Sequence, residues 1–450
     1  MRLFFSILAV FFSLSLACAQ DFDSQTLYDL RSAGNGIDVD HQGRVSPISK
    51  EKSTALGKLM QDVLEPPPEN MNRQIARRTI SLKKLDAQIN HIVEHNDFLP
   101  DVIRYFGGLT SIDYVVAVPE ENDLLLIGPA EGWRADAEGN VVGTQTGKPI
   151  LVLEDFLTAL RLWNNLNVPP DPGKTITIMC SFDPPLEMHN NFARLSREFP
   201  RIGAHNVEAY SSALSEISSE VPISLTGISE SSRFARILVA ADFQMKRIAL
   251  GITASNVLNL PSYVSMVSVN QSHLSPQFWL APHYTATTHD SRKLTWRLGD
   301  VKIRVQSRNL RSNAMDRAAF TWTNNFEANY DALAKSKPIF GELRNNMKIA
   351  LTASLIHHEN LFQRANCQLT ILLDENKLPL MNYPVPEFVE FSSVQSRNGS
   401  QIIVAYGGIM INPFGNNRIG TEPDVIRLDN TMDSQRTRLL QFDGDEWWSQ

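Results

Sequence analysis

The sequence of 450 residues has few cysteines, no excess of basic residues and, after its first residues, no long apolar run. Three cysteines are too few for a small disulfide-dense fold. The 42 basic residues are outnumbered by 49 acidic ones, so the chain as a whole has no attraction for nucleic acid. Apolar residues make up 43% of the chain and charged residues 20%, which excludes a disordered chain. The composition therefore indicates a globular protein.

The N-terminus has the pattern of a secretory signal peptide. Arg2 precedes an apolar run over residues 3–16, and Ala17-Cys18-Ala19 supplies the small residues that signal peptidase recognises. We predict cleavage before Gln20 and export to a periplasmic or extracellular compartment. The alternative is a lipoprotein signal, in which Cys18 becomes the acylated first residue. The apolar run is too short for a transmembrane helix, and the mature chain has no later candidate.

Two cysteines, Cys180 and Cys367, remain after cleavage before Gln20. Alternation of apolar residues over 176–182 and over 367–373 places each cysteine on the apolar face of a predicted strand. We predict two buried thiols. A disulfide between them is the alternative, since an exported protein meets oxidising conditions.

Helical and strand patterns alternate irregularly along the chain, which predicts an α+β fold of mixed helices and β-hairpins rather than a parallel doubly wound sheet. After the signal peptide, we predict four parts. They are an N-terminal extension with a Pro-rich joint (20–80), a central α+β region (81–310), a helical region that ends in a strand (311–385), and a β-hairpin with a loose polar tail (386–450).

Local sequence signals predict the positions of several helices and strands. Ser81 is a predicted N-cap for a helix with an apolar stripe, and strands are predicted at 112–118 and 124–127. Alternation on both sides of Gly299-Asp300 predicts a hairpin with a two-residue turn. Helical patterns from about residue 315 to 361 are divided by Pro338.

The pattern G-x-x-x-D-x-[QE]-G-x-V occurs twice, at residues 36–45 and 132–141. An aspartate can accept hydrogen bonds from backbone amides just after it, and the glycine three residues on tolerates positive φ. Both segments are therefore predicted hairpin turns. Shared turn chemistry explains the similarity without duplication, which remains the alternative.

Three segments resemble one protein family. They are residues 233–248 (RFARILVAADFQMKRI), 278–282 (FWLAP) and 338–345 (PIFGELRN). Over about residues 99–380 the chain is similar to the bacterial family known as domain of unknown function 1598. The resemblance implies an exported bacterial protein without an established role, and it supplies no catalytic residues.

The motif His91-Ile92-Val93-Glu94-His95 matches H-x-x-E-H, in which two histidines one helical turn apart bind zinc beside a glutamate base. Helical periodicity places His91 and His95 on the solvated side of their helix. A catalytic zinc also needs a third protein ligand. We therefore predict no metal site and an exposed polar face, with His91 and His95 as the alternative ligands.

Two other motifs are incomplete. Asp171–Thr175 contains the G-K-T of a phosphate loop but lacks the first glycine of that motif. Gly227–Ser231 lies between a predicted strand and a helix, as a nucleophile elbow does, but its second glycine is replaced by serine. We predict that Ser229 or Ser231 is the N-cap of that helix.

The helix that follows carries three arginines, Arg233, Arg236 and Arg247, on the side opposite its apolar stripe. Arginine pairs well with carboxylates, so this face is a candidate site for an anionic ligand, an envelope component or another part of the chain. The alternative is a solvated face.

The sequence contains no complete catalytic motif, phosphate loop or metal-ligand set. We predict an exported binding, structural or envelope-associated component without a cofactor, rather than an enzyme. The alternatives are a secreted hydrolase, zinc-dependent through His91, Glu94 and His95, and a small-molecule receptor. A receptor predicts an apolar pocket with convergent polar groups.

Overall fold

The computed structural model describes residues 33–165, 176–182, 185–200, 203, 205–217, 220–267, 276–309, 316–390, 393–395, 402–413, 426–440 and 446–450. The predicted signal peptide, the lipidation alternative at Cys18 and the segment Asp171–Thr175 lie outside these residues.

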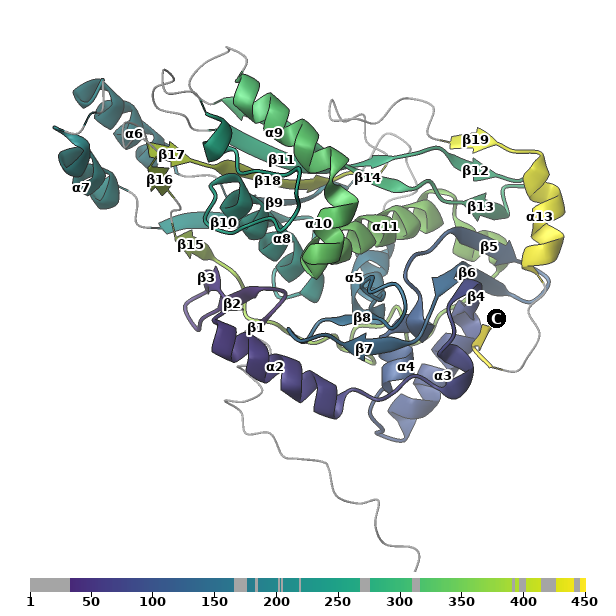
Figure 1. Cartoon of the computed structure of the whole chain (residues 1–450). Coiled ribbons are helices and arrows are strands. Elements are labelled where there is room, and N and C mark those ends of the chain that lie inside the picture. Colours follow the sequence, from purple (N-terminus) through teal and green to yellow (C-terminus); the bar gives the residue numbers. More distant parts are fainter. Residues whose placement is uncertain are drawn as a thin grey trace, which may run out of the picture.

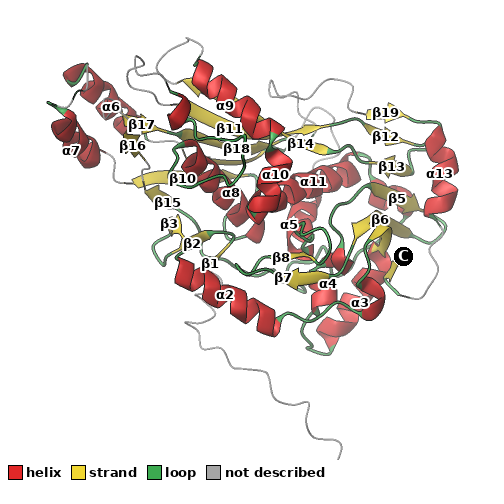
Figure 2. Cartoon of the chain, in the orientation of Figure 1, coloured by secondary structure: helices red, strands yellow, loops and turns green. Residues whose placement is uncertain are grey.

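The described residues form two large mixed sheets, which confirms the predicted α+β class (Figures 1 and 2). The first sheet has the order β1-β2-β3-β15-β10-β9-β18-β11-β14, with bounds Ala33–Gly34, Ile37–Val39, Arg44–Pro47, Phe388–Glu390, Glu220–Thr226, Ile178–Phe182, Tyr406–Ile411, Pro276–Tyr284 and Val301–Asn309. The second has the order β19-β12-β13-β5-β6-β4-β20, with bounds Ile426–Leu428, Thr287–His289, Thr295–Arg297, Tyr114–Val118, Asp123–Ala130, Ile75–Ser81 and Trp448–Ser449. Two small hairpins are β7–β8 (Trp133–Ala135, Val141–Gly143) and β16–β17 (Ser393–Gln395, Ile402–Val404).

Helix α11 (Pro338–His358) runs through the middle of the molecule, between the two sheets (Figure 1). It is buried on nearly all sides, as expected for a helix without a polar face. The other α-helices are α2 Lys50–Val63, α3 Leu82–Glu94, α4 Asp101–Arg104, α5 Leu153–Asn164, α6 Leu186–Glu198, α7 Val207–Ile217, α8 Arg233–Ala249, α9 Arg317–Ala328, α10 Tyr330–Ser336, α12 Leu361–Ala365 and α13 Thr431–Leu439. Short 3₁₀ helices are η1 Glu69–Met71, η2 Phe106–Gly108 and η3 Val264–Met266.

Several predicted elements are confirmed. The hydroxyl of Ser81 accepts a hydrogen bond from the amide of Lys84 and caps α3, whose apolar stripe is buried. Strands β5 and β6 pair antiparallel, and Pro338 separates α10 from α11. One hydrophobic core extends over the described part of the chain, from Ile37 to Trp447.

The repeated motif forms the same turn twice, as predicted. The carboxylate of Asp40 accepts from the amides two and four residues on, and Asp136 does the same in the second copy. Gly43 and Gly139 have φ of +79° and +87°, which favours glycine. Asp40 lies in the β2–β3 hairpin and Asp136 in the β7–β8 hairpin.

The predicted hairpin turn at Gly299-Asp300 is wrong. Strand β13 pairs with β12 in the second sheet, whereas β14 pairs with β11 in the first, so residues 276–309 form one long hairpin that bends where it changes sheets. Its turn is at residues 290–294, where Asp290 accepts hydrogen bonds from the amides of Leu294 and Thr295. A Cβ on Gly299 would lie 1.9 Å from the carbonyl oxygen of Thr285. This glycine therefore marks a close approach of two strands, not a turn.

The strand predicted at Cys367 is also wrong, because that segment is a loop after α12. Its backbone amides bind a side chain instead of a neighbouring strand. The carboxylate of Asp86, on α3, accepts from the amides of Thr370, Ile371 and Leu372 at 2.9, 3.0 and 2.9 Å. The helical region therefore does not end in a strand.

Both cysteines of the described chain, Cys180 in β9 and Cys367 in the loop, are free and buried. This confirms the predicted buried thiols. Burial raises the pKa of the Cys180 thiol well above its usual range and that of Cys367 to about 12. Such thiols are poor nucleophiles at neutral pH.

The hydrogen bonds that the carboxylate of Asp86 accepts should stabilise the folded protein. Asp86→Asn should lower the free energy of unfolding by about 2 kcal/mol, because the amide keeps one acceptor oxygen and turns hydrogens toward backbone N–H groups. Urea denaturation measures the change. Asp62→Asn, at an exposed position of α2, is the control and should change stability by less than about 0.5 kcal/mol. Equal stability of the two variants would contradict the role of Asp86.

The C-terminal tail is not loose where it is described. Arg436 of α13 is buried and donates to the hydroxyl of Thr295 and the carbonyl of Ala117. Trp447 is buried, and β20 pairs with β4. The predicted loose tail is wrong for these residues. Arg436, which the sequence suggests is solvated, instead forms hydrogen bonds with strands of the second sheet.

None of the helices in the described part of the chain is long and apolar enough to cross a membrane. The division of the chain into an N-terminal extension and three further parts stays a prediction.

Candidate functional site

The three candidate arginines of α8 have different surroundings. Arg236 is buried, with 1% of its surface exposed, and donates to the carbonyl of Ile37 at 3.1 Å. Arg247 is half-buried, donates to the hydroxyl of Thr253 and lies over the ring of Phe243. Arg233 forms ion pairs within the chain. The alternative of a solvated face is therefore wrong, whereas a role of these arginines in binding a partner stays a prediction.

Arg233 joins two carboxylates from other helices. One guanidinium nitrogen contacts Asp155 of α5, and another lies 2.9 Å from Glu342 of α11. Asn35, in the turn between β1 and β2, donates to the same oxygen of Glu342 at 2.6 Å. Burial acts to lower the pKa of Arg233, but the two carboxylates outweigh it and hold the pKa above its usual value. Arg233 therefore remains charged.

This cluster lies near the N-terminal ends of three helices. Arg233 is the first residue of α8, Asp155 belongs to the first turn of α5, and Glu342 is near the start of α11. The N-terminus of a helix carries a partial positive charge, which favours carboxylates. The apolar residues of α5 then pack its other faces into the core.

A cavity of about 560 Å³ adjoins the cluster. Its walls are largely aliphatic, and its polar groups converge from several elements. The lining residues used below are Glu138, Glu154, Arg233, Glu342, Met381 and Tyr383. Leu56, Met60, Leu99, Val152, Leu157 and Leu380 supply much of the apolar wall.

Glu154 is the unusual group of this cavity. Burial, and then the charge of Asp155, raise the pKa of its carboxyl to about 7, although Arg233 opposes the shift. Its Oε2 lies 3.4 Å from the hydroxyl of Tyr383, and its Oε1 is buried without a hydrogen-bond partner among the described residues. A buried acceptor without a partner is costly, so the site favours a ligand that donates to it.

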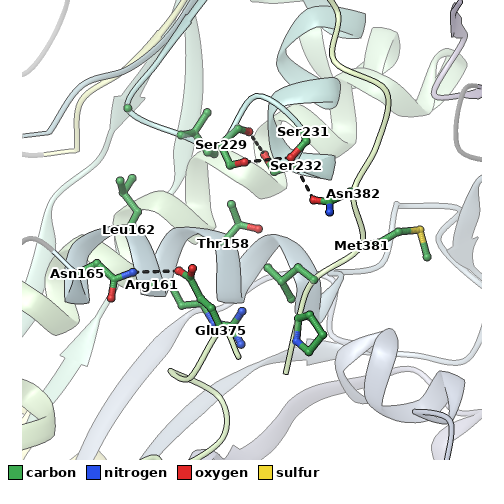
Figure 3. A pocket seen from close by; sticks show the side chains of 14 residues that line it. Thr158, Arg161, Leu162, Asn165, Ser229, Ser231, Ser232, Glu375, Met381 and Asn382 are labelled. Carbon is green, nitrogen blue, oxygen red and sulfur yellow. Dashed lines mark hydrogen bonds between the residues drawn. The ribbon is translucent and has the colours of Figure 1, made fainter. Parts of the chain in front are cut away.

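A second pocket, of about 650 Å³, is drawn in Figure 3, and residues 379–381 line both this pocket and the Glu154 cavity. Ser229 and Ser231 line the second pocket. Their hydroxyls lie 3.2 Å apart, and Ser231 donates to the amide oxygen of Asn382. The contacts of these serines include no catalytic base of the kind that a nucleophile elbow requires.

The predicted N-cap at Ser229 or Ser231 is wrong by one residue. Ser232 caps α8, because its hydroxyl accepts from the amide of Ala235. Ser229 contributes to the same turn, since its carbonyl accepts from the Ser232 hydroxyl at 2.6 Å. Three serines within four residues, Ser229, Ser231 and Ser232, made the position of the N-cap ambiguous in the sequence.

His91 and His95 lie on the exposed side of α3, with stacked rings whose centroids are 4.2 Å apart. Nδ1 of His95 is 2.7 Å from the carbonyl of His91, and Glu94 accepts from Asn90. The described residues contain no group of three or more side chains suited to a metal ion. The motif therefore forms a helix end in this structure.

Sequence reasoning found Arg233 but missed its partners. Asp155 and Glu342 are 78 and 109 residues away from it. One signal was available: Glu154 and Asp155 are adjacent carboxylates at the start of a helix that is otherwise mostly apolar. Such a pair needs a cation or a proton when the helix is buried.

Comparison with known proteins gives one match. The family described as "Protein of unknown function (DUF1598)" matches residues 180–263, which run from β9 through α8 to the loop beyond it. The match contains all three candidate arginines but is narrower than residues 99–380. No curated protein and no solved structure matches the chain. This part of the chain is thus similar to a domain of unknown function.

Proposed function

We propose that the protein binds a small organic molecule in the Glu154 cavity, and that the ligand has an apolar body and an ammonium or similar donor group. The observation that carries this proposal is the buried Oε1 of Glu154, which has no hydrogen-bond partner among the described residues and belongs to a side chain that lines a cavity with aliphatic walls. Pockets of this kind bind ligands by apolar burial and orient them through a few polar groups.

Charge favours a cationic ligand. Arg233 is shared by Asp155 and Glu342, so it cannot also neutralise Glu154. Two further arginines line the cavity: Arg104 lies 4.0 Å from Asp101, and Arg236 donates to the carbonyl of Ile37. A ligand ammonium would provide the missing positive charge and the missing donor at once.

We also propose that this binding takes place after export, in a bacterial periplasmic or extracellular space, where the protein acts as a binding or envelope-associated component. Support comes from the signal-peptide pattern of residues 1–19 and from the resemblance to an exported family.

A secreted hydrolase is the second candidate function. In this hydrolase Glu154, rather than the zinc motif, would transfer protons. A carboxyl with a pKa of about 7 is suited to transfer protons at neutral pH. It would act without the zinc motif, because His91 and His95 lie on an exposed face without a third ligand among the described residues. No serine, threonine or cysteine lines the described cavity, and this ranks the hydrolase second.

Binding can be tested with three probes of similar shape: 2-phenylethylamine, 2-phenylethanol and 3-phenylpropionate. We expect calorimetry to detect the amine alone at pH 8, where Glu154 is ionised. Protonation of Glu154 should weaken binding about 30-fold at pH 5.5. Glu154→Gln should abolish the preference for the amine.

Glu138→Gln is the matched control, because Glu138 lines the same cavity but is exposed. This variant should bind the amine like the unchanged protein. Equal binding of the amine and the carboxylate, or amine binding that survives Glu154→Gln, would refute the proposal.

A further inference from the structure

A third cavity, of about 630 Å³, lies on a different face of α11 from Glu342 and is separate in its lining from the Glu154 cavity. Lys348 of α11 forms part of its wall, with 5% of its surface exposed. Asp300 and Val301, at the bend of the long hairpin, also line the cavity. A buried lysine at a cavity wall can have a function beyond packing.

The amine of Lys348 is held by backbone carbonyls at that bend. Its Nζ donates to Gly299 at 2.7 Å and to Leu298 at 3.4 Å. A neutral amine has two hydrogens and one lone pair, so two carbonyls can take both hydrogens. The lone pair then remains available to a group in the cavity that Lys348 lines.

The neutral amine is accessible near physiological pH. Burial lowers the pKa of Lys348 to about 8, while Asp113 and Asp300 oppose the shift and Arg297 adds to it. An exposed lysine has a pKa of about 10.4, so Lys348 has far more of the nucleophilic form at pH 7 to 8.

Four basic side chains and three aspartates line the same cavity, and one of the aspartates, Asp331, pairs with Arg344. Lys148, Lys335 and Arg344 line it together with Lys348. One nitrogen of Arg344 lies 2.7 Å from Asp331, whereas its buried Nε has no hydrogen-bond partner among the described residues. These groups suit a carboxylate or phosphate on the ligand.

We propose that Lys348 forms an imine with an aldehyde or ketone that carries an anionic group. The nitrogen lone pair attacks the carbonyl carbon, and the carbonyl oxygen takes a proton to give a carbinolamine. Loss of the hydroxyl as water, with a proton from nitrogen, then forms the carbon–nitrogen double bond. Asp113 and Asp300 line the cavity and can carry these protons. The step needs no oxidant or reductant, and it is independent of the function proposed for the Glu154 cavity.

The test traps the imine with cyanoborohydride in the full chain, using 4-carboxybenzaldehyde and, as the neutral probe, benzaldehyde. Peptide mapping should find Lys348 labelled at least about tenfold faster than Lys58, an exposed lysine of α2, at pH 7. The pH profile of labelling at Lys348 should have its midpoint near 8.

Two variants separate the parts of the proposal. Lys348→Arg should remove the fast-labelled site. Lys148→Met with Lys335→Met should leave Lys348 reactive but reduce its preference for the anionic aldehyde. Labelling of Lys348 in the unchanged protein no faster than that of Lys58 would overturn the proposal, whatever the stability of the variants. Fast labelling without preference for the anionic probe would overturn the assignment of the ligand class.

Discussion

Arg233→Met is expected to lower the free energy of unfolding by about 3 to 5 kcal/mol. The substitution keeps an apolar stem of similar length but removes the cation between Asp155 and Glu342. The side chains of these residues are only 3% and 6% exposed, so water cannot replace the guanidinium. Two buried carboxylates would then remain without a partner of opposite charge, and chemical denaturation at pH 7 measures the cost.

Arg44→Met is the matched control for this experiment. Arg44 and Glu220 are 2.7 Å apart, but their side chains are 52% and 36% exposed. Loss of an exposed pair should cost no more than about 1 kcal/mol. Adding Glu342→Gln to Arg233→Met should recover part of the stability, because it removes one of the uncompensated charges. If Arg233→Met were as mild as Arg44→Met, the cluster would not be an essential part of the folded state.

Elements fixed by local chemistry could be predicted from the sequence. The cap of α3 joins Ser81 to an amide three residues on, and the turns at Asp40 and Asp136 use amides two and four residues away. Every group in these interactions lies within one short window. The local sequence is therefore almost sufficient to predict this cap and these turns.

Elements fixed by distant partners could not be predicted in this way. The segment after Cys367 alternates like a strand, but its amides bind Asp86, which is 284 residues from Thr370. Alternation through Gly299 correctly indicated strands on both sides, yet the choice of partner strands depended on β11 and β12. Periodicity reports which face is buried, not which strand lies beside it.

In the candidate site, too, some features could be predicted from the sequence and others depend on distant residues. The arginines of α8 were visible as a pattern, but their burial was not, because Arg233 pairs with residues of α5 and α11 and Arg236 binds a carbonyl of β2, all distant in the chain. Lys348 gave no signal, since one lysine in a helix is usually solvated. Tertiary packing brings these charged side chains together from different helices. Only the folded structure can therefore identify such a cluster.

The Arg233 cluster also explains the state of Glu154. Asp155 contacts the guanidinium of Arg233 directly, whereas the hydrogen-bond partner of Glu154 among the described residues is the hydroxyl of Tyr383. Arg233 is thus shared by the two carboxylates that it contacts, Asp155 and Glu342. Glu154 is left to hold a proton or to accept a ligand.

Glu154→Gln is therefore expected to change how stability depends on pH. The pKa of Glu154 rises from 4.5 to about 7 on folding, so its contribution to stability is fully present below pH 4.5 and is lost as pH rises through 7. A shift of this size corresponds to about 3 kcal/mol. Glutamine stays neutral, so the variant should match the unchanged protein near pH 4 and exceed its stability by up to about 3 kcal/mol at pH 8.

Urea denaturation at intervals between pH 4 and 8 measures this difference, with Glu138→Gln as the control whose pH profile should follow that of the unchanged protein. At pH 8, 2-phenylethylamine should stabilise the unchanged protein but not Glu154→Gln, because its ammonium can neutralise the carboxylate that destabilises the fold. A gain in stability without this ligand response would leave Glu154 as a buried acid with no role in binding. Parallel pH profiles for Glu154→Gln and the unchanged protein would show that Glu154 titrates near its ordinary pKa, and the charge argument for a cationic ligand would then fail.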